Sequence, residues 1–478
     1  MVYPKIIQGG MGVAISTWQL AQAVSCTGQL GVVSGTGIGI ILIARLMDGD
    51  KDGHTRRALA HFPQQDVAQR IIDTYYVEGG KPTGTGYKRP TMWTVKPSAS
   101  LEELTVVANF AEVWLAKEGH NNPVGINLLE KVQMPTMASL YGAMLAGVDY
   151  VIMGAGIPTQ IPGILDSLAR HEAVRYRLDV IGHANDIEMY IYFNCETSFS
   201  GLSEKLGMLK RPLFLPIVSS VVLAMALLKR SSGEVNGFIV ELPSAGGHNA
   251  PPRNKNSFND LGEPLYTEKD AVDINRIAAL GLPFWLAGGY GNAAKLQEAL
   301  ALGAQGIQVG TAFAFCDESG MTNDIKTAVV SRVKSGMISV FTDPVVSPTG
   351  FPFKVVQLEG TISDTTLYKG RSRICDIGYL RQIYSDEAET LGYRCAAEPI
   401  DAYLKKAGEL DATTGRKCLC NHLGAAAGYP QVHSDGLIEP ALVTAGDALV
   451  DLGQFLGANA THYSAEDVIK TLLASSVR

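Results

Sequence analysis

The most constraining feature of this sequence is a series of eight short apolar runs between Lys5 and Thr311. Each run is rich in β-branched or aliphatic residues, and its apolar character is continuous rather than alternating. A strand shows this pattern when it is buried on both faces, as in a parallel sheet covered by helices. The runs are Lys5–Gly10, Leu30–Gly35, Val124–Leu128, Tyr150–Gly154, Leu213–Ser219, Gly237–Glu241, Pro283–Gly288 and Gly306–Thr311.

Several intervals between these runs carry helical patterns. Ser16 is suited to cap a helix that stops at Gly28, Thr267 with Asp270 resembles a capping box, and Asn292 is placed to open a helix closed at Gly303. Eight alternations of strand and helix predict a closed TIM (β/α)8 barrel. An open doubly wound sheet is disfavoured because no G-x-G-x-x-G fingerprint follows the first strand.

Two intervals are too long for simple crossovers. About ninety residues separate the second run from the third, which predicts an insertion over about 38–120 with a helix near Leu101–Glu118. Leu178–Ile181 and Met189–Phe193 look like an extra pair of short strands. The rhythm changes near Met337, so we predict a barrel over 1–336 and a C-terminal region over 337–478 that packs on it.

Composition excludes several classes of function. The net charge is −7 and no basic run is present, so nucleic acid is not an expected partner. The longest apolar stretches, such as Ile38–Ala44 and Val221–Leu228, fall short of the roughly 20 residues that a spanning helix needs. The N-terminus leads straight into the first run with no signal-peptide pattern. We therefore expect a cytoplasmic protein that binds a small-molecule substrate, and a homo-oligomer is compatible with the sequence.

The ends of the last three runs carry the residues best suited to chemistry. The chemistry of a TIM barrel lies at the carboxyl ends of its strands, and phosphate is often bound after the seventh and eighth. Ala287–Gly291 follows the seventh run and Gln308–Thr311 ends the eighth, which together predict a phosphate cradle. After the sixth run, Gly246 and Gly247 precede His248, which we expect to act as a general acid or base.

Seven motifs resemble the nitronate monooxygenase, or 2-nitropropane dioxygenase, family, which is related to the FMN-containing enoyl-thioester reductases. The resemblance extends from Met1 to about Gly320. The motifs are KIIQGGM (Lys5–Met11), LGVVSG (Leu30–Gly35), VGINL (Val124–Leu128), GAG (Gly154–Gly156), AGGH (Ala245–His248), AGG (Ala287–Gly289) and QVGT (Gln308–Thr311).

The resemblance implies an FMN-binding barrel with His248 as the residue that exchanges protons with the substrate. It implies that Gly10 and Met11 contact the flavin ring, that Asn127 hydrogen-bonds it, and that Gly246 lies beside it. It further implies a cofactor contact from Glu241 and a phosphate site formed by Gly288, Gly289, Gln308, Gly310 and Thr311.

The substrate is open at this level. Glu241 and Ser244 stand where the monooxygenases commonly have Gln and Glu, and the carboxylate resembles the enoyl-reductase branch. The first expectation is oxidation of a nitronate or a similar carbon acid. The alternatives are NAD(P)H-dependent reduction of an enoyl thioester, with the same barrel and flavin, and a non-catalytic flavin-binding subunit.

Four of the seven cysteines lie close together in the C-terminal region. Cys375, Cys395, Cys418 and Cys420 have the number of thiols that a structural zinc or an iron–sulfur cluster takes. The spacing of Cys418 and Cys420 differs from the familiar C-x2-C pair, which favours the alternative that all four are ordinary thiols.

Overall fold

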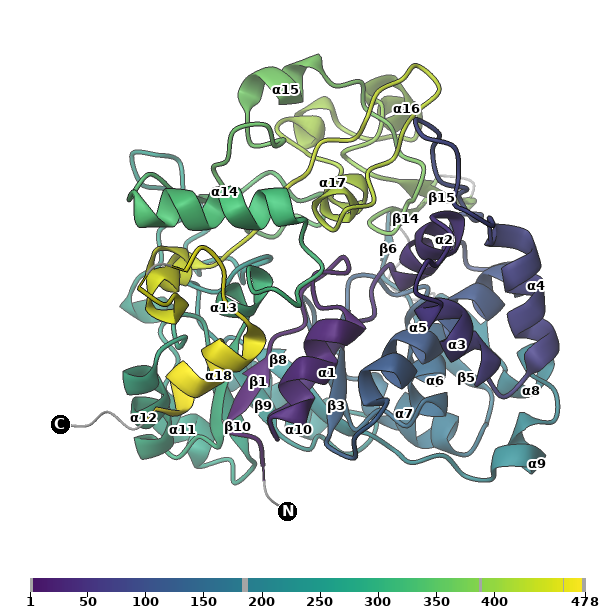
Figure 1. The fold of residues 1–478 in the computed structure, drawn as a ribbon, viewed down its shortest axis with the longest axis horizontal. Helices are drawn as coiled ribbons and strands as arrows, with labels where there is room; N and C mark the ends of the chain where they lie inside the picture. Colours follow the sequence, from purple (N-terminus) through teal and green to yellow (C-terminus); the bar gives the residue numbers. More distant parts are fainter. Residues whose placement is uncertain (1–2, 183–187, 387–388, 459, 475–478) are drawn as a thin grey trace.

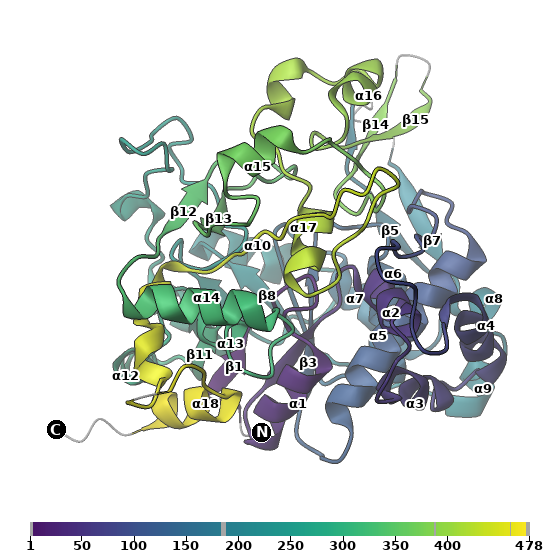
Figure 2. The ribbon, with the colours of Figure 1, turned by 45° about the horizontal axis from the view of Figure 1, so that its top comes forward.

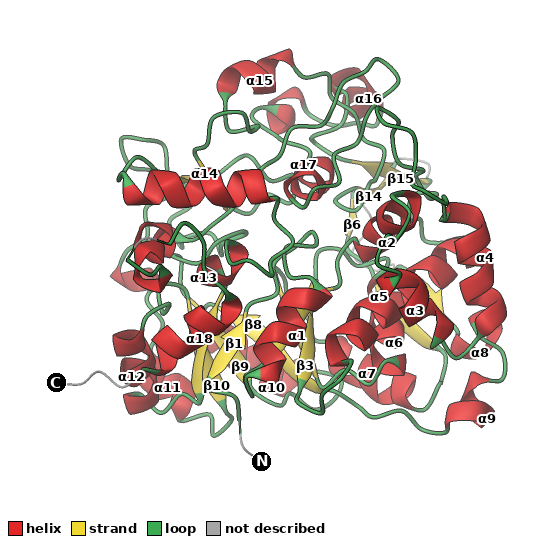
Figure 3. Cartoon of the chain, viewed as in Figure 1, coloured by secondary structure: helices red, strands yellow, loops and turns green. Residues whose placement is uncertain are grey.

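The computed structural model describes residues 3–182, 188–386, 389–458 and 460–474. Its centre is a parallel eight-stranded sheet in the order β1-β11-β10-β9-β8-β4-β3-β2. A parallel bridge between Ile7 and Leu30 joins the two edges, with the Gln8 N–H donating to the Leu30 carbonyl at 2.9 Å. The barrel is therefore closed, and the predicted TIM fold is confirmed (Figures 1 and 3).

All eight predicted runs form the barrel strands. They are β1 (Ile6–Gln8), β2 (Gly31–Ser34), β3 (Val124–Leu129), β4 (Tyr150–Gly154), β8 (Leu213–Val218), β9 (Phe238–Glu241), β10 (Phe284–Ala287) and β11 (Gly306–Val309). Inside the barrel, side chains such as Val32, Ile152, Ile239 and Trp285 form a separate buried cluster. The outward faces are covered by helices, which explains the continuous apolar character of the strands.

In the part of the chain that the structure describes, eight helices surround the strands. They are α1 (Trp18–Cys26), α5 (Ala99–Lys117), α6 (Thr136–Leu145), α7 (Ile161–Ala169), α10 (Val221–Arg230), α11 (Ile274–Ala278), α12 (Ala293–Ala301) and α18 (Ala465–Leu473). The last of them, α18, comes from the C-terminus and packs against both α12 and α1, in the position of the eighth barrel helix (Figure 1). The division at residue 336 stays a prediction, and the chain returns to the barrel after its C-terminal region.

Two predicted helix starts differ in the structure. The cap of α1 is Thr17, whose hydroxyl accepts from Leu20 N. Ser16 instead accepts from Met11 N at 2.8 Å and donates to the Gly9 carbonyl, because its side chain faces the loop after β1. The capping box of Thr267 and Asp270 exists, but it opens only the 3-10 turn η1 (Glu268–Asp270), and Asp273 caps α11. The predicted cap of α12 by Asn292 is confirmed.

The two insertions form small units beside the barrel. The first contains α2 (Ile38–Met47), α3 (His54–Ala60) and α4 (Gln65–Tyr75), which pack on α5 (Figure 1). The second contains β5 (Val174–Arg177), β6 (Val180–Ile181), β7 (Tyr190–Phe193), α8 (Cys195–Ser198) and α9 (Leu202–Leu206). The predicted strand pair is only partly right. β7 pairs with β5, whereas β6 pairs with β14 of the C-terminal region, a long-range contact that local sequence does not reveal.

The C-terminal region lies over the carboxyl ends of the barrel strands (Figure 2). After the last barrel strand, α13 (Thr311–Ala314) and α14 (Asn323–Lys334) lead into this region. Its own elements are β12 (Val340–Asp343), β13 (Phe353–Val356), α15 (Thr365–Gly370), β14 (Gln382–Ser385), β15 (Leu391–Arg394), α16 (Ile400–Lys405), η2 (Leu410–Thr413), α17 (Leu419–Ala426) and η3 (Asp447–Phe455), followed by α18. No helix in the described ranges is both long and apolar enough to cross a membrane.

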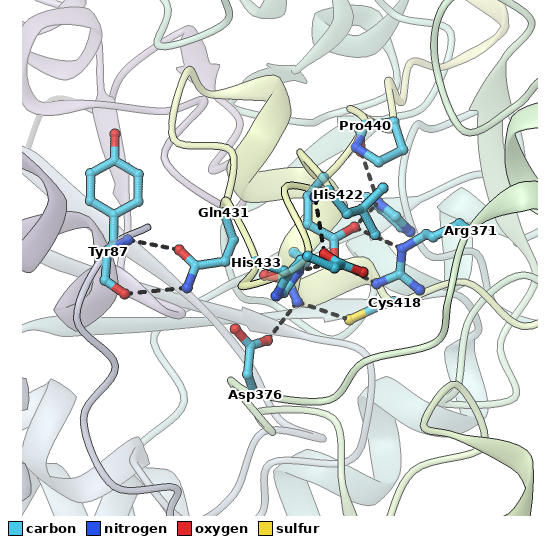
Figure 4. A network of polar contacts seen from close by, with 12 residues as sticks. Tyr87, Arg371, Asp376, Cys418, His422, Gln431, His433 and Pro440 are labelled. Atoms are coloured by element: carbon cyan, nitrogen blue, oxygen red, sulfur yellow. Dashed lines mark hydrogen bonds and ion pairs between the residues drawn. The ribbon is translucent and has the colours of Figure 1, made fainter. Parts of the chain in front are cut away.

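A buried polar network fixes the region internally and to the first insertion (Figure 4). The fully buried carboxylate of Glu439 accepts two hydrogen bonds from Arg371, at 2.6 and 2.7 Å, and lies 2.8 Å from His433 Nε2. Gln431 joins the network to the insertion through the backbone N–H and carbonyl of Tyr87. The bidentate geometry and the additional partner compensate for removing the carboxylate from water.

The same network predicts a loss of stability in mild acid. Burial lowers the pKa of His422 to about 4 from its ordinary value of 6.5, and the Arg371 charge acts in the same direction. Between these values the unfolded chain binds a proton that the folded chain does not, so the free energy of unfolding falls as the pH drops from 6.5 toward 4. We expect His422→Gln to reduce this slope in urea titrations. The exposed His61→Gln is the control, and equal slopes in both variants and the wild type would contradict the prediction.

Candidate functional site

A cavity of about 240 Å³ opens at the carboxyl ends of the strands. All the residues predicted for the site line it, although they come from five barrel strands and the loops that follow them. They are Gly10, Met11, Asn127, Glu241, Gly246, His248, Gly288, Gly289, Gln308, Gly310 and Thr311. The structure therefore brings the predicted residues together, and their individual roles stay predictions.

One end of the cavity has the features of a phosphate cradle. Gly288 and Gly289 adopt φ values of +82° and +74°, a left-handed conformation that favours glycine. Their backbone N–H groups, and that of Gly310, find no acceptor among the residues that the structure describes. The Thr311 hydroxyl accepts from Gly446 N at 2.8 Å, which leaves its own hydrogen available to a ligand.

The wall between this cradle and the barrel centre contains unpartnered amide oxygens. Oδ1 of Asn127 and Oε1 of Gln308 are buried and accept no hydrogen bond. The other end of the Asn127 amide donates to the Gly10 carbonyl at 2.9 Å, so its orientation is fixed. A buried acceptor without a donor is costly and indicates that a ligand supplies the donor. Together with the free N–H groups, these oxygens fit a ligand that has both a ring N–H donor and a phosphate, as FMN has.

The cavity has no fixed positive side chain: among the described residues, neither Lys nor Arg lines it. Most of its lining is small or apolar, including Val13, Ile217, Phe353 and Leu452. The carboxyl of Glu241 makes no hydrogen bond or ion pair in the described part of the chain, and burial raises its pKa to about 8. Glu241 is therefore mainly protonated near neutral pH, and the cavity carries little net charge.

His248 lies in the wall of the cavity and is held from the C-terminal side. Its backbone forms an antiparallel bridge with Phe353, and its ring meets the Phe353 ring edge to face at 4.8 Å between centroids. Nε2 lies 2.7 Å from the Ser347 hydroxyl, whereas Nδ1 has no partner among the described residues. Burial lowers the pKa of His248 to about 4, so the imidazole is neutral at pH 7 with one nitrogen free to meet a substrate.

Sequence reasoning missed the contribution of the chain near its C-terminus. The segment Thr444–Asp447 crosses the loop after β9, where the Thr444 hydroxyl accepts from Gly247 N at 2.9 Å. A Cβ on Gly246 would lie 2.7 Å from Gly446 N, so this glycine is required by the crossing segment as well as by any ligand. Thr444, Ala445, Ala448, Leu452, Gln454 and Phe455 also line the cavity. No local motif marks these residues, because only their long-range contacts place them there.

The four late cysteines do not form the predicted metal site. Among the residues that the structure describes, no group of three or more His, Cys, Asp or Glu side chains could hold a metal ion. Burial, with smaller contributions from Cys418 and Glu398, raises the pKa of Cys375 to about 12, and burial raises the pKa of Cys418 as well. The structure does not show the predicted zinc or iron–sulfur site at these cysteines.

Comparison with known proteins confirms the predicted resemblance for part of the chain. Residues 204–343 match the family model described as nitronate monooxygenase, a segment that runs from α9 to the end of β12 and includes His248 and the two phosphate motifs. No curated protein sequence matches the chain significantly.

Solved structures similar to the chain have low sequence identity to it. They include a nitroalkane oxidase from Streptomyces ansochromogenes (14% identity, 98% of this chain and 95% of that chain covered, TM-score 0.48). The enoyl reductase domain of MlnA from the macrolactin biosynthesis cluster of Bacillus amyloliquefaciens is 11% identical, with 98% and 92% covered and a TM-score of 0.47. FabK from Thermotoga maritima is 15% identical, with 99% and 92% covered and a TM-score of 0.46.

Proposed function

We propose that this protein is an FMN-dependent oxidoreductase that acts on a small organic substrate, either a carbon acid or an enoyl thioester, bound beside His248. The observation that carries the proposal is the cavity itself. Unpaired backbone N–H groups at Gly288, Gly289 and Gly310 and the unpartnered amides of Asn127 and Gln308 line one continuous space with His248. When bound there, FMN supplies hydride or electron transfer, and the residues of the chain bind it, exclude water and manage the proton.

Two substrate classes remain candidates. The match over residues 204–343 supports oxidation of a nitronate or a similar carbon acid. The uncharged cavity favours the second class, a neutral enoyl thioester reduced with NAD(P)H, because an anionic nitronate would meet no fixed cation in the lining. The apolar lining around Phe353 and Leu452 also suits an acyl chain. We therefore place enoyl-thioester reduction first on the chemistry of the cavity.

An absorption spectrum followed by anaerobic titration tests the proposal. We expect the purified protein to show oxidised flavin bands and to release FMN on denaturation. Rapid bleaching by NADPH or NADH, with colour restored by an enoyl thioester, indicates the reductase. Bleaching by a nitronate without a nicotinamide indicates the oxidase. Failure to bind added FMN would contradict the whole proposal, and FMN binding without turnover on either class would support the non-catalytic alternative.

A further inference from the structure

A second cavity, of about 260 Å³, is formed where the two insertions meet the C-terminal region. Trp93 comes from the first insertion, Asp179 from the second and Tyr379 from the C-terminal region. The pairing of β6 with β14, which contribute Ile181 and Ile383 to the lining, joins the second insertion to the C-terminal region here (Figure 1). Because these segments are far apart in the chain, no local motif marks the cavity.

The second cavity carries fixed positive charge, unlike the cavity that holds His248. Lys131 and Arg381 line it, and Asp179 is the single acidic residue among the described residues of its lining. Two positive charges against one negative charge leave the lining with one net positive charge. Lys131 and Asp179 form an ion pair of 3.3 Å in which 73% of the Asp179 side chain is exposed, so water screens it strongly. The charge that remains for a ligand is therefore mainly that of Arg381.

The Arg381 guanidinium is held in place without an acidic partner. Its Nε donates to the Gly378 carbonyl at 3.3 Å, and Nη2 donates to the Trp93 carbonyl. The group also lies over the Tyr393 ring, 5.0 Å from its centroid. Within the described ranges Nη1 has no acceptor, and no carboxylate forms an ion pair with the side chain. Backbone carbonyls and an aromatic ring thus fix the guanidinium, while its charge and one nitrogen stay available to an anion.

The N-terminus of α6 opens at the same cavity. Met134 and Pro135, the two residues before the helix, line the cavity, and no side chain caps the helix. The N–H groups of Met137 and Ala138 in its first turn find no acceptor among the residues that the structure describes. Trp93, a lining residue that is only 4% exposed, also has an indole N–H without an acceptor there. An uncapped helix N-terminus and unpaired donors beside a guanidinium favour an anionic ligand.

The second cavity lies behind the wall that carries His248. Thr349 lines it, and the Thr349 hydroxyl oxygen lies 2.7 Å from the Ser347 hydroxyl. That hydroxyl in turn lies 2.7 Å from His248 Nε2. Along this line the two cavities are separated only by the side chains of these three residues. The second cavity is therefore placed to hold a part of a reactant that is remote from its reacting atoms.

We propose that the second cavity binds a phosphate group of an organic ligand, with Arg381 and the N-terminus of α6 as its main partners. Apolar lining residues such as Ile181 and Leu380 suit the organic part of the ligand. The inference rests on the proposed function, whose reactants offer two sources of this chemistry. NADPH carries a 2′-phosphate on its adenosine ribose, and an enoyl thioester of phosphopantetheine carries a phosphate at the far end of the pantetheine arm. In both, the phosphate is remote from the reacting atoms, as the separation of the two cavities requires.

Calorimetric titration of the full-length protein, saturated with FMN so that the phosphate cradle of the first cavity is filled, tests the proposal. The probes are 2′,5′-ADP for the reductant and 4′-phosphopantetheine for the thioester, with adenosine and pantetheine as their phosphate-free counterparts. We expect a phosphorylated probe to bind about tenfold or more tightly than its counterpart, and the probe that does so identifies the source. Binding of neither phosphorylated probe, or equal binding of each probe and its counterpart, would overturn the proposal.

Substitutions locate the bound phosphate. We expect Arg381→Gln to weaken binding of that probe about tenfold or more, because it removes the unpaired charge. Lys131→Gln leaves the contact between Arg381 and Trp93 intact and should weaken binding less, because Lys131 is already paired with Asp179. Arg253→Gln is the matched control, since Arg253 is exposed and lines neither cavity. Unchanged affinity in Arg381→Gln, or in Lys131→Gln if the first variant does not fold, would contradict the assignment.

Steady-state kinetics separate the second cavity from the place of the chemistry. Arg381 does not line the cavity that holds His248, so Arg381→Gln should raise the KM of the reactant that carries the phosphate and leave kcat unchanged. If that reactant is NADPH, the KM for NADH, which lacks the 2′-phosphate, should not respond. A fall in kcat without a rise in either KM would count against the proposal. The titrations need no turnover, and the dependence on Arg381 locates the probe even in flavin-free protein, so their failure is distinguishable from failure of the proposed function.

Discussion

His248→Ala is expected to retain FMN and to lose about 10²–10⁴-fold of its turnover on a neutral substrate. His248 is the only histidine among the residues that line the cavity in the described part of the chain. Its Nδ1 has no protein partner in the described part of the chain, so the variant removes the group proposed to meet the substrate and breaks only the contact with Ser347. The cradle of Gly288, Gly289 and Gly310 is untouched, which predicts normal flavin content.

Steady-state rates and flavin content are measured on the same preparations. His248→Gln keeps a side chain with a hydrogen-bond donor and should fall between the wild type and alanine variants. On an already ionised nitronate, which has no α-proton to remove, we expect His248→Ala to lose less activity than on a neutral substrate. Equal turnover of His248→Ala and wild type on the neutral substrate would show that the proton moves elsewhere and would refute the assignment.

Gly288→Val is expected to abolish FMN retention. A Cβ at this position would lie 2.7 Å from the Leu242 carbonyl, and the φ of +82° is unfavourable for any β-branched side chain. The substitution therefore displaces the backbone at the N–H groups proposed to meet the phosphate. Copurified flavin at the wild-type ratio in Gly288→Val would contradict the cradle.

Backbone strain complicates that variant, and Gly310→Val separates the two effects. The φ of Gly310 is −106°, and a Cβ there would meet nothing nearer than the Met11 sulfur at 3.6 Å. A valine therefore fills the cradle without a left-handed conformation, and we expect FMN binding to fall while thermal unfolding stays near that of wild type. Gly303→Val is the converse control, with a φ of +87° and open space around it. We expect Gly303→Val to lower the thermal stability and to retain FMN. If Gly303→Val also lost FMN, the loss in Gly288→Val would be explained by backbone strain rather than by a blocked phosphate site.

Local sequence determined the barrel and the part of the site that lies on its strands. Strands buried on both faces require continuous apolar runs, and the carboxyl ends of parallel strands share one rim. His248, Gly288 and Gln308 could therefore be placed at a common site from their positions in the chain alone. The cap at Asn292 was predictable for the same reason, since its partner, Lys295 N, lies three residues away.

Only the tertiary structure decided which groups surround those residues. Ser347 lies 99 residues from His248 in the chain, and Gly446 lies 135 residues from Thr311. Hydrogen bonds between residues this far apart leave no periodic pattern in the sequence. A serine or glycine in a loop that reaches the site therefore cannot be distinguished, from sequence alone, from one in any other loop. The late cysteines show the opposite case: a local count suggested metal ligands, but the described residues contain no group of three or more side chains that could hold a metal ion. Local sequence thus determined where the candidate site residues gather, and packing of the C-terminal region over the barrel decided that His248 is buried and neutral at pH 7.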